Sequence, residues 1–467
     1  MKTGTEYKSE NSSYLFMLAL VAALGGFLFG FDTAVISGTE GFVKNKFLLD
    51  ALAEGWFVGI ALLGCIIGVL IAGYLSDRFG RKPVLMLSAV LFFSSAAGCA
   101  ISSSYMQLVI YRLIGGLGIG VASIVSPLYI SEIAIPRMRG KLVTLYQLAI
   151  TVGILAAYLS NYWILTNASG HQNSAETFWH WIMTDEIWRG MFGAGTIPAF
   201  FFILFLFFVP ESPRFLMLKG NEEKAHLIIA HINGETNARK EILDIKQSFN
   251  TKTGTYKELF KPGIFKALII GISLAVFSQF SGINAIIYYG VKILKEAGLG
   301  SGSAFWGQVT IGIVNTLFTF VAIFTIDKFG RKPLLIWGVS GAVIALIIVG
   351  VLFALNITSS TLLLIFILLY IACFAFSFGP VVWVILSEIY PTRIRGRAMG
   401  IATLSLWVGT WIVGQFTPFL LETIKPYGTF WLFALTCFPA IIVTWKFVPE
   451  TKNKPLEEIE KLWSKSE

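Results

Sequence analysis

Long apolar runs separated by short polar segments dominate the chain. Twelve runs of about twenty residues carry almost no charge, and a helix of about twenty apolar residues crosses the roughly 30 Å hydrocarbon core of a bilayer. The pattern therefore predicts an all-α polytopic membrane protein with twelve transmembrane helices. The predicted spans are 14–36, 54–75, 84–102, 107–130, 141–163, 189–209, 265–290, 304–326, 334–355, 361–386, 397–420 and 428–448.

Composition and charge support this class. Hydrophobic residues make up 55% of the chain and charged residues 13%, whereas a soluble domain carries roughly twice that charge. With the N-terminus in the cytoplasm, 29 of the 36 Lys and Arg residues fall on the cytoplasmic side and 6 on the other, with Arg112 inside a span. This asymmetry follows the positive-inside rule. The net charge of +9 thus reports topology rather than nucleic-acid binding.

The chain repeats itself at three places. "GYLSDRFGRKPVLM" at 73–86 returns as "FTIDKFGRKPLLI" at 324–336, "SEIAIPRMRGK" from Ser131 returns as "SEIYPTRIRGR" from Ser387, and "VPESPR" at 209–214 returns as "VPETK" at 448–452. The first two offsets are 250 and 256 residues, and each motif follows the same span of its half. The pattern indicates two parallel copies of a six-span unit.

The repeated charges are candidate gating residues. We expect them to form breakable ion pairs between helices that hold one face shut while the other opens; the alternative is that they only anchor the topology. They are Asp77, Arg81, Glu132, Arg139, Glu211, Arg214, Asp327, Arg331, Glu388, Arg395 and Glu450.

The repeat also predicts the domain organisation. Residues 1–209 form one six-helix bundle and 265–448 the other, followed by a cytoplasmic tail at 449–467. The polar segment 210–264 contains "NEEKAHLIIAHI" and "ARKEILDIKQSF", whose apolar spacing favours short amphipathic cytoplasmic helices. A disordered tether is the alternative.

Asp32 is a carboxylate inside an apolar run, "GGFLFGFDTAVISG". An ionisable group at membrane depth usually marks a substrate pathway or a proton relay. Topology places Asp32 and Arg112 about five residues, on the order of 7 Å, below the same outer boundary. Burial disfavours the charged carboxylate and the guanidinium favours it, so helix motion can switch its protonation. A static ion pair, or a carboxylate at headgroup level, is the alternative.

The motifs resemble the sugar porters of the major facilitator superfamily, in particular its bacterial D-xylose–proton symporters, and more distantly the facilitative glucose transporters. The resemblance covers essentially the whole chain through "GFDTAVISG", "DRFGRKP", "RLIGGLGIG", "SPLYISEIA", "VPESPR", "QFSGINAIIYY", "DKFGRKP", "GPVVWVILSEIYP", "RIRGRA" and "VPETK". It implies two bundles, alternating access about a central site and a monosaccharide substrate. Proton-coupled members have Asp where Asp32 stands, whereas animal facilitators have Asn.

Polar and aromatic residues inside the spans are candidate sugar ligands. Sugar hydroxyls require amides that donate and accept, and sugar rings pack on aromatic faces. Gly379–Pro380 breaks the tenth span beside Trp383 and frees backbone groups there. With the resemblance, the set is Phe29, Gln147, Gln279, Asn284, Tyr288, Asn315, Gly379, Trp383 and Trp407. Interhelical packing is the alternative for each of them.

Two departures affect the choice of sugar. Ser278 stands where the xylose symporters have the first of two glutamines, and Leu406 stands where they have a glutamine and the facilitators an asparagine. Each lost amide removes roughly 1 kcal/mol of hydrogen bonding. The preferred pentose or hexose is therefore left open.

We therefore predict a proton-coupled monosaccharide importer of the inner (plasma) membrane, functional as a monomer, with both termini cytoplasmic. The four cysteines lie in apolar spans without metal-ligand spacing, so no metal, cofactor or disulfide is expected. A uniporter is the nearest alternative. A sugar sensor would need a long signalling extension, and an enzyme would need a nucleophile–base pair at a common depth; the sequence favours neither.

Overall fold

The computed structural model describes residues 11–135, 138–168, 180–249, 255–356, 360–391 and 393–452, and residues 454, 458, 459 and 463. Within these residues the fold is helical, and twelve helices are long and apolar enough to cross a membrane. Each of the twelve predicted spans therefore coincides with one of these helices, although some of the ends differ. Residues 1–10 and most of the predicted tail after 452 lie outside the described part.

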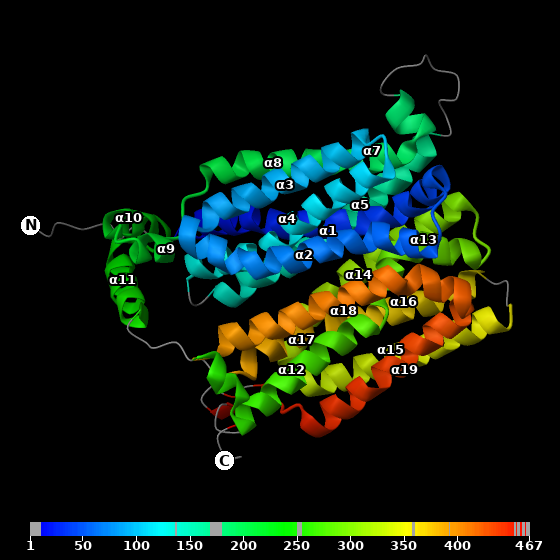
Figure 1. Cartoon of the computed structure of the whole chain (residues 1–467). Coiled ribbons are helices and arrows are strands. Elements are labelled where there is room, and N and C mark those ends of the chain that lie inside the picture. The colour runs from blue at the N-terminus through cyan, green and yellow to red at the C-terminus, as the bar shows by residue number, and fades with distance from the viewer. Residues whose placement is uncertain are drawn as a thin grey trace, which may run out of the picture.

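The first six spans form one bundle, the N-lobe (Figure 1). A short π-helical turn at Trp181–Asp185 precedes the sixth span, which is made of two helices separated at Gly195. The helices are α1 (Ser12–Phe47), α2 (Ala51–Phe79), α3 (Arg81–Ile101), α4 (Tyr105–Ile133), α5 (Arg139–Ala168), α7 (Ile187–Ala194) and α8 (Thr196–Phe208).

The last six spans form the C-lobe, in which the first and fourth spans are each interrupted. A single 3₁₀ turn, Tyr256–Phe260, leads into it. The helices are α12 (Pro262–Phe280), α13 (Ile283–Glu296), α14 (Ser301–Phe329), α15 (Arg331–Ala354), α16 (Ser360–Phe376), α17 (Phe378–Glu388), α18 (Arg395–Thr423) and α19 (Lys425–Phe447).

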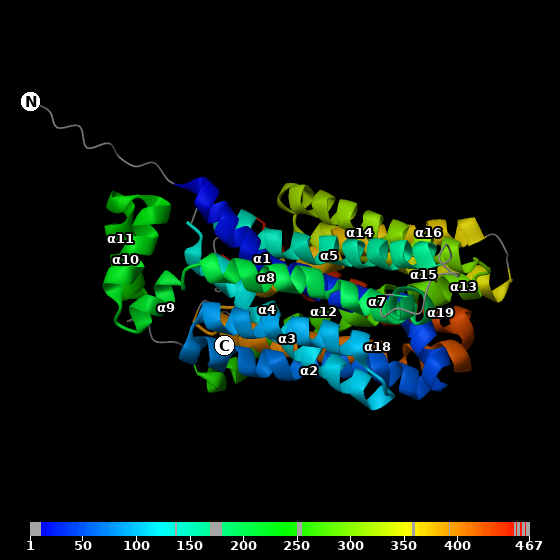
Figure 2. The same ribbon diagram turned by 90° about the horizontal axis from the view of Figure 1, so that it is seen from above.

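Three helices connect the lobes on one side of the molecule: α9 (Pro213–Leu218), α10 (Glu222–Asn233) and α11 (Glu235–Phe249). The two amphipathic helices predicted in the linker are therefore confirmed. In both views these helices lie beyond the same end of the bundles (Figures 1 and 2). We call this the linker end, and the opposite end, where α13 and α14 meet, the far end.

Large apolar side chains cover the outer surface of the bundles. Phe207, Phe208, Phe324 and Trp445 are each more than 60% exposed on the transmembrane helices. Water would make such a surface unfavourable, whereas hydrocarbon does not. With twelve apolar helices, the chain is a multi-pass membrane protein.

Small residues let α2 and α4 approach closely. A Cβ on Gly64 would lie 2.9 Å from the Gly116 Cα, and one on Gly68 would lie 3.0 Å from the Gly120 Cα. These glycines therefore form a contact face between the two spans. Gly73 is an exception: open space surrounds it, because α2 has passed the contact region by that point.

The break predicted in the tenth span is present but lies slightly earlier. The helix stops at Ser377 and restarts at Phe378, so that Pro380 sits in the first turn of α17. Proline lacks the N–H that would bond to the carbonyl four residues back, and the first turn of a helix tolerates this. A second break, at Ser281–Gly282 between α12 and α13, has Gly282 at φ 85°. Its position was not predicted.

The first helix is longer than its apolar run. The predicted end near residue 36 was wrong, since α1 continues to Phe47. Ser37 and Glu40 are 2% and 3% exposed there, and the Asn161 amide donates to the Val35 carbonyl at 3.1 Å. These polar groups face protein rather than lipid, so they extend the helix. Asp32 consequently lies further from the helix end than predicted.

Alanine substitution should separate contact glycines from surface glycines. A Cβ on Gly116 would overlap the Ala61 carbonyl oxygen, so Gly116→Ala should cost about 1–3 kcal/mol of stability. Gly73→Ala should be neutral or stabilise by up to about 1 kcal/mol. Unfolding of the purified variants in detergent measures both. Equal stability of the two variants would contradict the close approach of α2 and α4.

Candidate functional site

Asp32 and Arg112 form an ion pair between α1 and α4. The Arg112 Nη1 donates to the Asp32 Oδ2 at 2.9 Å, and it also lies 3.5 Å from the Asp32 carbonyl oxygen. The two side chains are 14% and 3% exposed respectively. The contact agrees with the topological expectation, and its role in proton coupling stays a prediction.

The pair lies beside a small cavity and an aromatic ring. A cavity of about 10 Å³, about the space of one water molecule, is lined by both residues and by Tyr288 of α13. The Arg112 Nε has no hydrogen-bond partner among the described residues, and its guanidinium lies 5.8 Å from the centre of the Phe192 ring. The carboxylate is thus the main polar partner of a buried cation, so neutralising Asp32 leaves Arg112 poorly satisfied.

An amide cluster lies where α12, α13 and α18 meet. The Asn284 Nδ2 donates to the Gln279 Oε1 at 2.7 Å, and the Thr410 hydroxyl donates to the same oxygen at 3.0 Å. The Gln279 Nε2 donates to the Ser278 hydroxyl at 2.9 Å. Ser278, which replaces an expected glutamine, therefore orients Gln279. Thr410 and Ser278 were not among the predicted site residues, since hydroxyls are common throughout the spans.

Two predicted aromatic residues meet across the lobe interface. The ring centres of Phe29 in α1 and Trp407 in α18 are 5.5 Å apart. Phe29 is one turn from Asp32 on α1, so motion of this helix moves both residues together. The sequence could place these rings in the same region but not in contact.

The other predicted ligands are not joined to these groups by contacts of the described residues. Gln147 is partly buried, Asn315 is 8% exposed and Trp383 is 37% exposed. Gly379 follows the break at Ser377. Their role in sugar binding remains a prediction. An apolar cavity of about 290 Å³ between α12 and α18 is lined by Val276, Phe280, Leu404, Ser405, Val408, Gly409 and Ile412; it offers few hydrogen bonds and does not suit a sugar.

Hydrogen bonds join the lobes from their middle to the far end. The Thr316 hydroxyl donates to the Thr151 carbonyl at 3.2 Å near the middle. Towards the far end, the Tyr158 hydroxyl donates to the Ile287 carbonyl at 3.1 Å and the Gln415 amide to the Leu52 carbonyl at 3.1 Å. In Figure 1 the ribbons of the two lobes diverge from these contacts towards the linker end.

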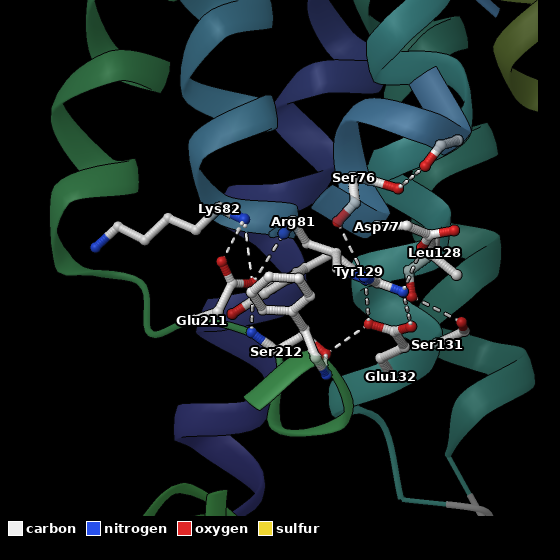
Figure 3. A network of polar contacts seen from close by, with 12 residues as sticks. Ser76, Asp77, Arg81, Lys82, Leu128, Tyr129, Ser131, Glu132, Glu211 and Ser212 are labelled. Carbon is white, nitrogen blue, oxygen red and sulfur yellow. Dashed lines mark hydrogen bonds and ion pairs between the residues drawn. The ribbon is translucent and has the colours of Figure 1, made fainter. Parts of the chain in front are cut away.

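The repeated charges form a network at the linker end of the N-lobe (Figure 3). Arg81 donates to the two carboxylate oxygens of Glu132 at 2.8 and 2.9 Å, and Asp77 lies 3.4 Å from Arg81. Glu211 accepts the Arg81 backbone N–H at 3.0 Å, and the Ser212 hydroxyl donates to Glu132 at 2.5 Å. The network ties α2, α3 and α4 to the segment after α8.

The C-lobe repeats this network almost contact for contact. Arg331 donates to Glu388 at 3.0 and 3.2 Å and lies 3.1 Å from Asp327. Glu450 accepts the Arg331 backbone N–H at 3.1 Å, and the Thr451 hydroxyl donates to Glu388 at 2.5 Å. Each network lies within its own lobe and does not cross to the other.

The pKa values of the matching carboxylates Glu211 and Glu450 are shifted in opposite directions. Burial raises the pKa of Glu211 above its usual value, against the opposing hydrogen bonds from the Ser212, Lys82 and Arg81 N–H groups. Burial also acts to raise the pKa of Glu450, but the N–H groups of Lys452, Arg331 and Lys332 outweigh it and lower that pKa. Acidification therefore neutralises Glu211 before Glu450.

The remaining predicted gating residues lie around these networks. Arg139 begins α5 and is exposed. Arg395 begins α18, where its guanidinium lies 3.4 Å from the Tyr390 carbonyl. Arg214 lies in α9. Glu132 pairs with Arg81. The sequence could not distinguish Arg81 from Arg139 as the partner of Glu132, because both arginines lie at the same end of the bundle.

Two six-helix lobes around polar groups, with equivalent ion-pair networks at one end, define a membrane transporter of the major facilitator type rather than an enzyme. The model of the sugar (and other) transporter family matches residues 18–463. The chain belongs to this family.

Relatives and solved structures agree with this assignment. The chain is 42% identical over 460 residues to the arabinose-proton symporter of Bacillus subtilis (strain 168), covering 98% of this chain and 97% of the relative. It is 41% identical to the D-xylose-proton symporter of Escherichia coli (strain K12), covering 97% and 96%. A structure of the E. coli xylose transporter in a partially occluded inward open conformation matches with a TM-score of 0.83 and 38% identity, covering 95% and 100%.

Removing the charge of Glu132 should destabilise the N-lobe. The Arg81 and Glu132 side chains are 5% and 4% exposed, so Glu132→Gln leaves a buried guanidinium without its carboxylate at a cost of about 3–5 kcal/mol. Asp77→Asn is the matched control, since Asp77 is 73% exposed and its loss should cost less than about 1 kcal/mol. Unfolding in detergent compares them; equal losses would contradict the buried pairing.

Proposed function

We propose that this chain is a proton-coupled monosaccharide importer that works by alternating access. The observation that carries the proposal is the buried Asp32–Arg112 pair at 2.9 Å, on a helix that also contacts the opposite lobe. Its relatives are named as proton symporters for arabinose and D-xylose. The substrates we assign are therefore a pentose or a hexose, and protons.

Orientation follows from the distribution of charge. The positive-inside rule assigns the linker end to the cytoplasm, so both termini are cytoplasmic and the membrane is the plasma membrane, the inner one in a bacterium. Contacts between the lobes run from the middle to the far end, so the sugar site communicates with the cytoplasm in this conformation. The similar E. coli structure, described as inward open, supports this interpretation.

Coupling follows from the partners of Asp32. When Asp32 is ionised, its ion pair holds α1 against α4. A proton on Asp32 removes most of that attraction, so α1 is released from α4. Phe29 moves with α1 against Trp407, beside the amide cluster of Gln279. The protonated state thereby permits closure over a bound sugar.

The functional units follow the fold. Residues 1–209 and 265–448 act as rocking bundles, the linker at 210–264 connects them, and 449–467 form a tail. Each bundle contains its own ion-pair network at the linker end. The networks therefore fix the shape of that end, which the opposite bundle contacts when the linker end closes. A monomer contains all of these parts. A facilitative uniporter remains the second candidate; it needs the same site without transfer of protons.

Asp32→Asn should abolish uphill accumulation of sugar but spare exchange. The amide cannot take up and release a proton, whereas its size preserves the site. Uptake against an imposed pH gradient and counterflow in proteoliposomes measure the two activities. Asp50→Asn is a suitable control, because Asp50 caps α2 through a 2.8 Å bond from the Ala53 N–H that Asn can also accept. Persistent accumulation in Asp32→Asn would assign coupling elsewhere.

Leu406→Gln should change the sugar preference. Leu406 is 8% exposed and one turn from Thr410, whose hydroxyl oxygen lies 2.9 Å from the Leu406 carbonyl oxygen. A glutamine here adds donors and acceptors beside Gln279, so relative affinities among pentoses and hexoses should shift by about fivefold or more. Counterflow with a panel of sugars measures this. Leu404→Gln, in the apolar cavity, should leave the order of preference among the sugars unchanged. The same change of preference in both variants would contradict the placement of Leu406 at the sugar site.

A further inference from the structure

The amide cluster between α12, α13 and α18 has a direction, because each of its hydrogen bonds needs one donor and one acceptor. Ser278 lies at one end of the cluster and is 2% exposed. Its hydroxyl donates to the Ala275 carbonyl at 2.7 Å. A hydroxyl has a single hydrogen, so the Ser278 Oγ can only accept from its other polar neighbour, Gln279.

The direction passes from Ser278 through Gln279 to Asn284. The Gln279 Nε2 faces Ser278 at 2.9 Å, so its Oε1 points the other way and accepts from the Asn284 Nδ2 at 2.7 Å. The Thr410 Oγ1 lies 3.0 Å from the Gln279 Oε1 and 2.9 Å from the Leu406 carbonyl oxygen. Because its hydrogen can go to either acceptor, Thr410 fits both orientations of the Gln279 amide. Ser278 therefore decides the direction.

The last group in this series is the Asn284 Oδ1. Asn284 is half-buried in the first turn of α13, and among the described residues no group donates to its Oδ1. Tyr288 lies one turn further along the same face of α13 and lines the cavity beside Asp32. Asn284 therefore lies on the face of α13 that is turned towards the N-lobe.

We propose that Ser278 is a positioning residue that sets the hydrogen-bond direction of the amide cluster, so that Asn284 offers an acceptor to the sugar. This inference rests on the sugar-importing function proposed above and adds a requirement for its substrate. At the position beside Asn284, the sugar needs a hydroxyl that donates. The opposite orientation of Gln279, with its Nε2 directed at Asn284, would turn the Asn284 amide so that it offers N–H groups to the sugar instead.

The first test uses the unmodified protein and modified sugars. Replacing a hydroxyl by hydrogen removes its donor and its acceptor, whereas replacing it by fluorine removes the donor but keeps a weak acceptor. At the hydroxyl that Asn284 recognises, the deoxy and deoxyfluoro analogues should both bind about fivefold or more weakly than the parent sugar. Competition in counterflow measures these affinities. Asn284→Ala identifies the hydroxyl, because the penalty for its removal disappears in that variant.

The outcomes of this test separate the inference from the proposed function. A deoxyfluoro analogue that binds as well as the parent sugar at this hydroxyl overturns the inference, because Asn284 is then a donor. An Asn284→Ala variant that retains the penalty at every hydroxyl also overturns it. Both results leave the importing function intact. Absence of counterflow for every pentose and hexose in the wild type refutes that function, and the inference with it.

The second test changes Ser278 itself. Ser278→Ala removes the acceptor that holds the Gln279 Nε2, so the opposite orientation, in which Gln279 donates to Thr410 and Asn284, becomes accessible. The deoxyfluoro analogue should then bind about threefold or more tightly than the deoxy analogue, whereas the two bind equally to the wild type. Ser278→Thr keeps the hydroxyl and should restore equal binding. A loss of packing alone weakens the binding of both analogues to the same extent.

Ser281→Ala is the matched control. Ser281 is 0% exposed and its hydroxyl donates to the Ser278 carbonyl at 2.7 Å, but none of its side-chain hydrogen bonds to the described residues involves an amide side chain. The ratio of the affinities for the two analogues should stay as in the wild type. An unchanged ratio in Ser278→Ala, or the same change in Ser281→Ala, overturns the proposal.

Discussion

The free-energy cost of a charge in hydrocarbon is the constraint on which this structure depends. A lone ionised side chain at membrane depth costs at least a few kcal/mol, and three buried charges of the described residues have a counter-charge on another helix. Asp32 pairs with Arg112, Arg81 with Glu132, and Glu54 with two lysines. Each pair therefore holds two elements together, and the state of the pair decides whether those elements can part.

The placement of the pairs gives them different tasks. Asp32–Arg112 lies within one lobe but on a helix that contacts the other, and the two linker-end networks brace each lobe internally. At the far end, the Lys292–Glu54 ion pair crosses the interface between the lobes. Bracing lets each bundle move as a body, whereas the crossing pair resists separation at one end only. This distribution is the one that the proposed rocking about the middle contacts requires.

The sequence predicted most of the fold because its signals are local. Apolar runs defined the twelve helices, and the repeat defined two bundles. Polar ends of helices were harder to predict: α1 continues past residue 36 to Phe47, because its polar groups pair with groups of α2, α5 and the opposite lobe. Hydropathy cannot distinguish a polar residue that faces water from one that is paired inside the protein. The same limit hid the Lys292–Glu54 ion pair between the lobes.

The site was partly predictable for a related reason. Depth along helices of known direction placed Asp32 and Arg112 at a common level, and the structure joins them. The depth of a residue does not say which way its helix is rotated or how the lobes meet. The Phe29–Trp407 contact and the Thr410–Gln279 hydrogen bond could therefore not be predicted from the sequence. Ser278 shows the consequence. Judged by residue type it is a lost amide, but in place it orients Gln279, so substitutions in this site change the direction of hydrogen bonds as well as their number.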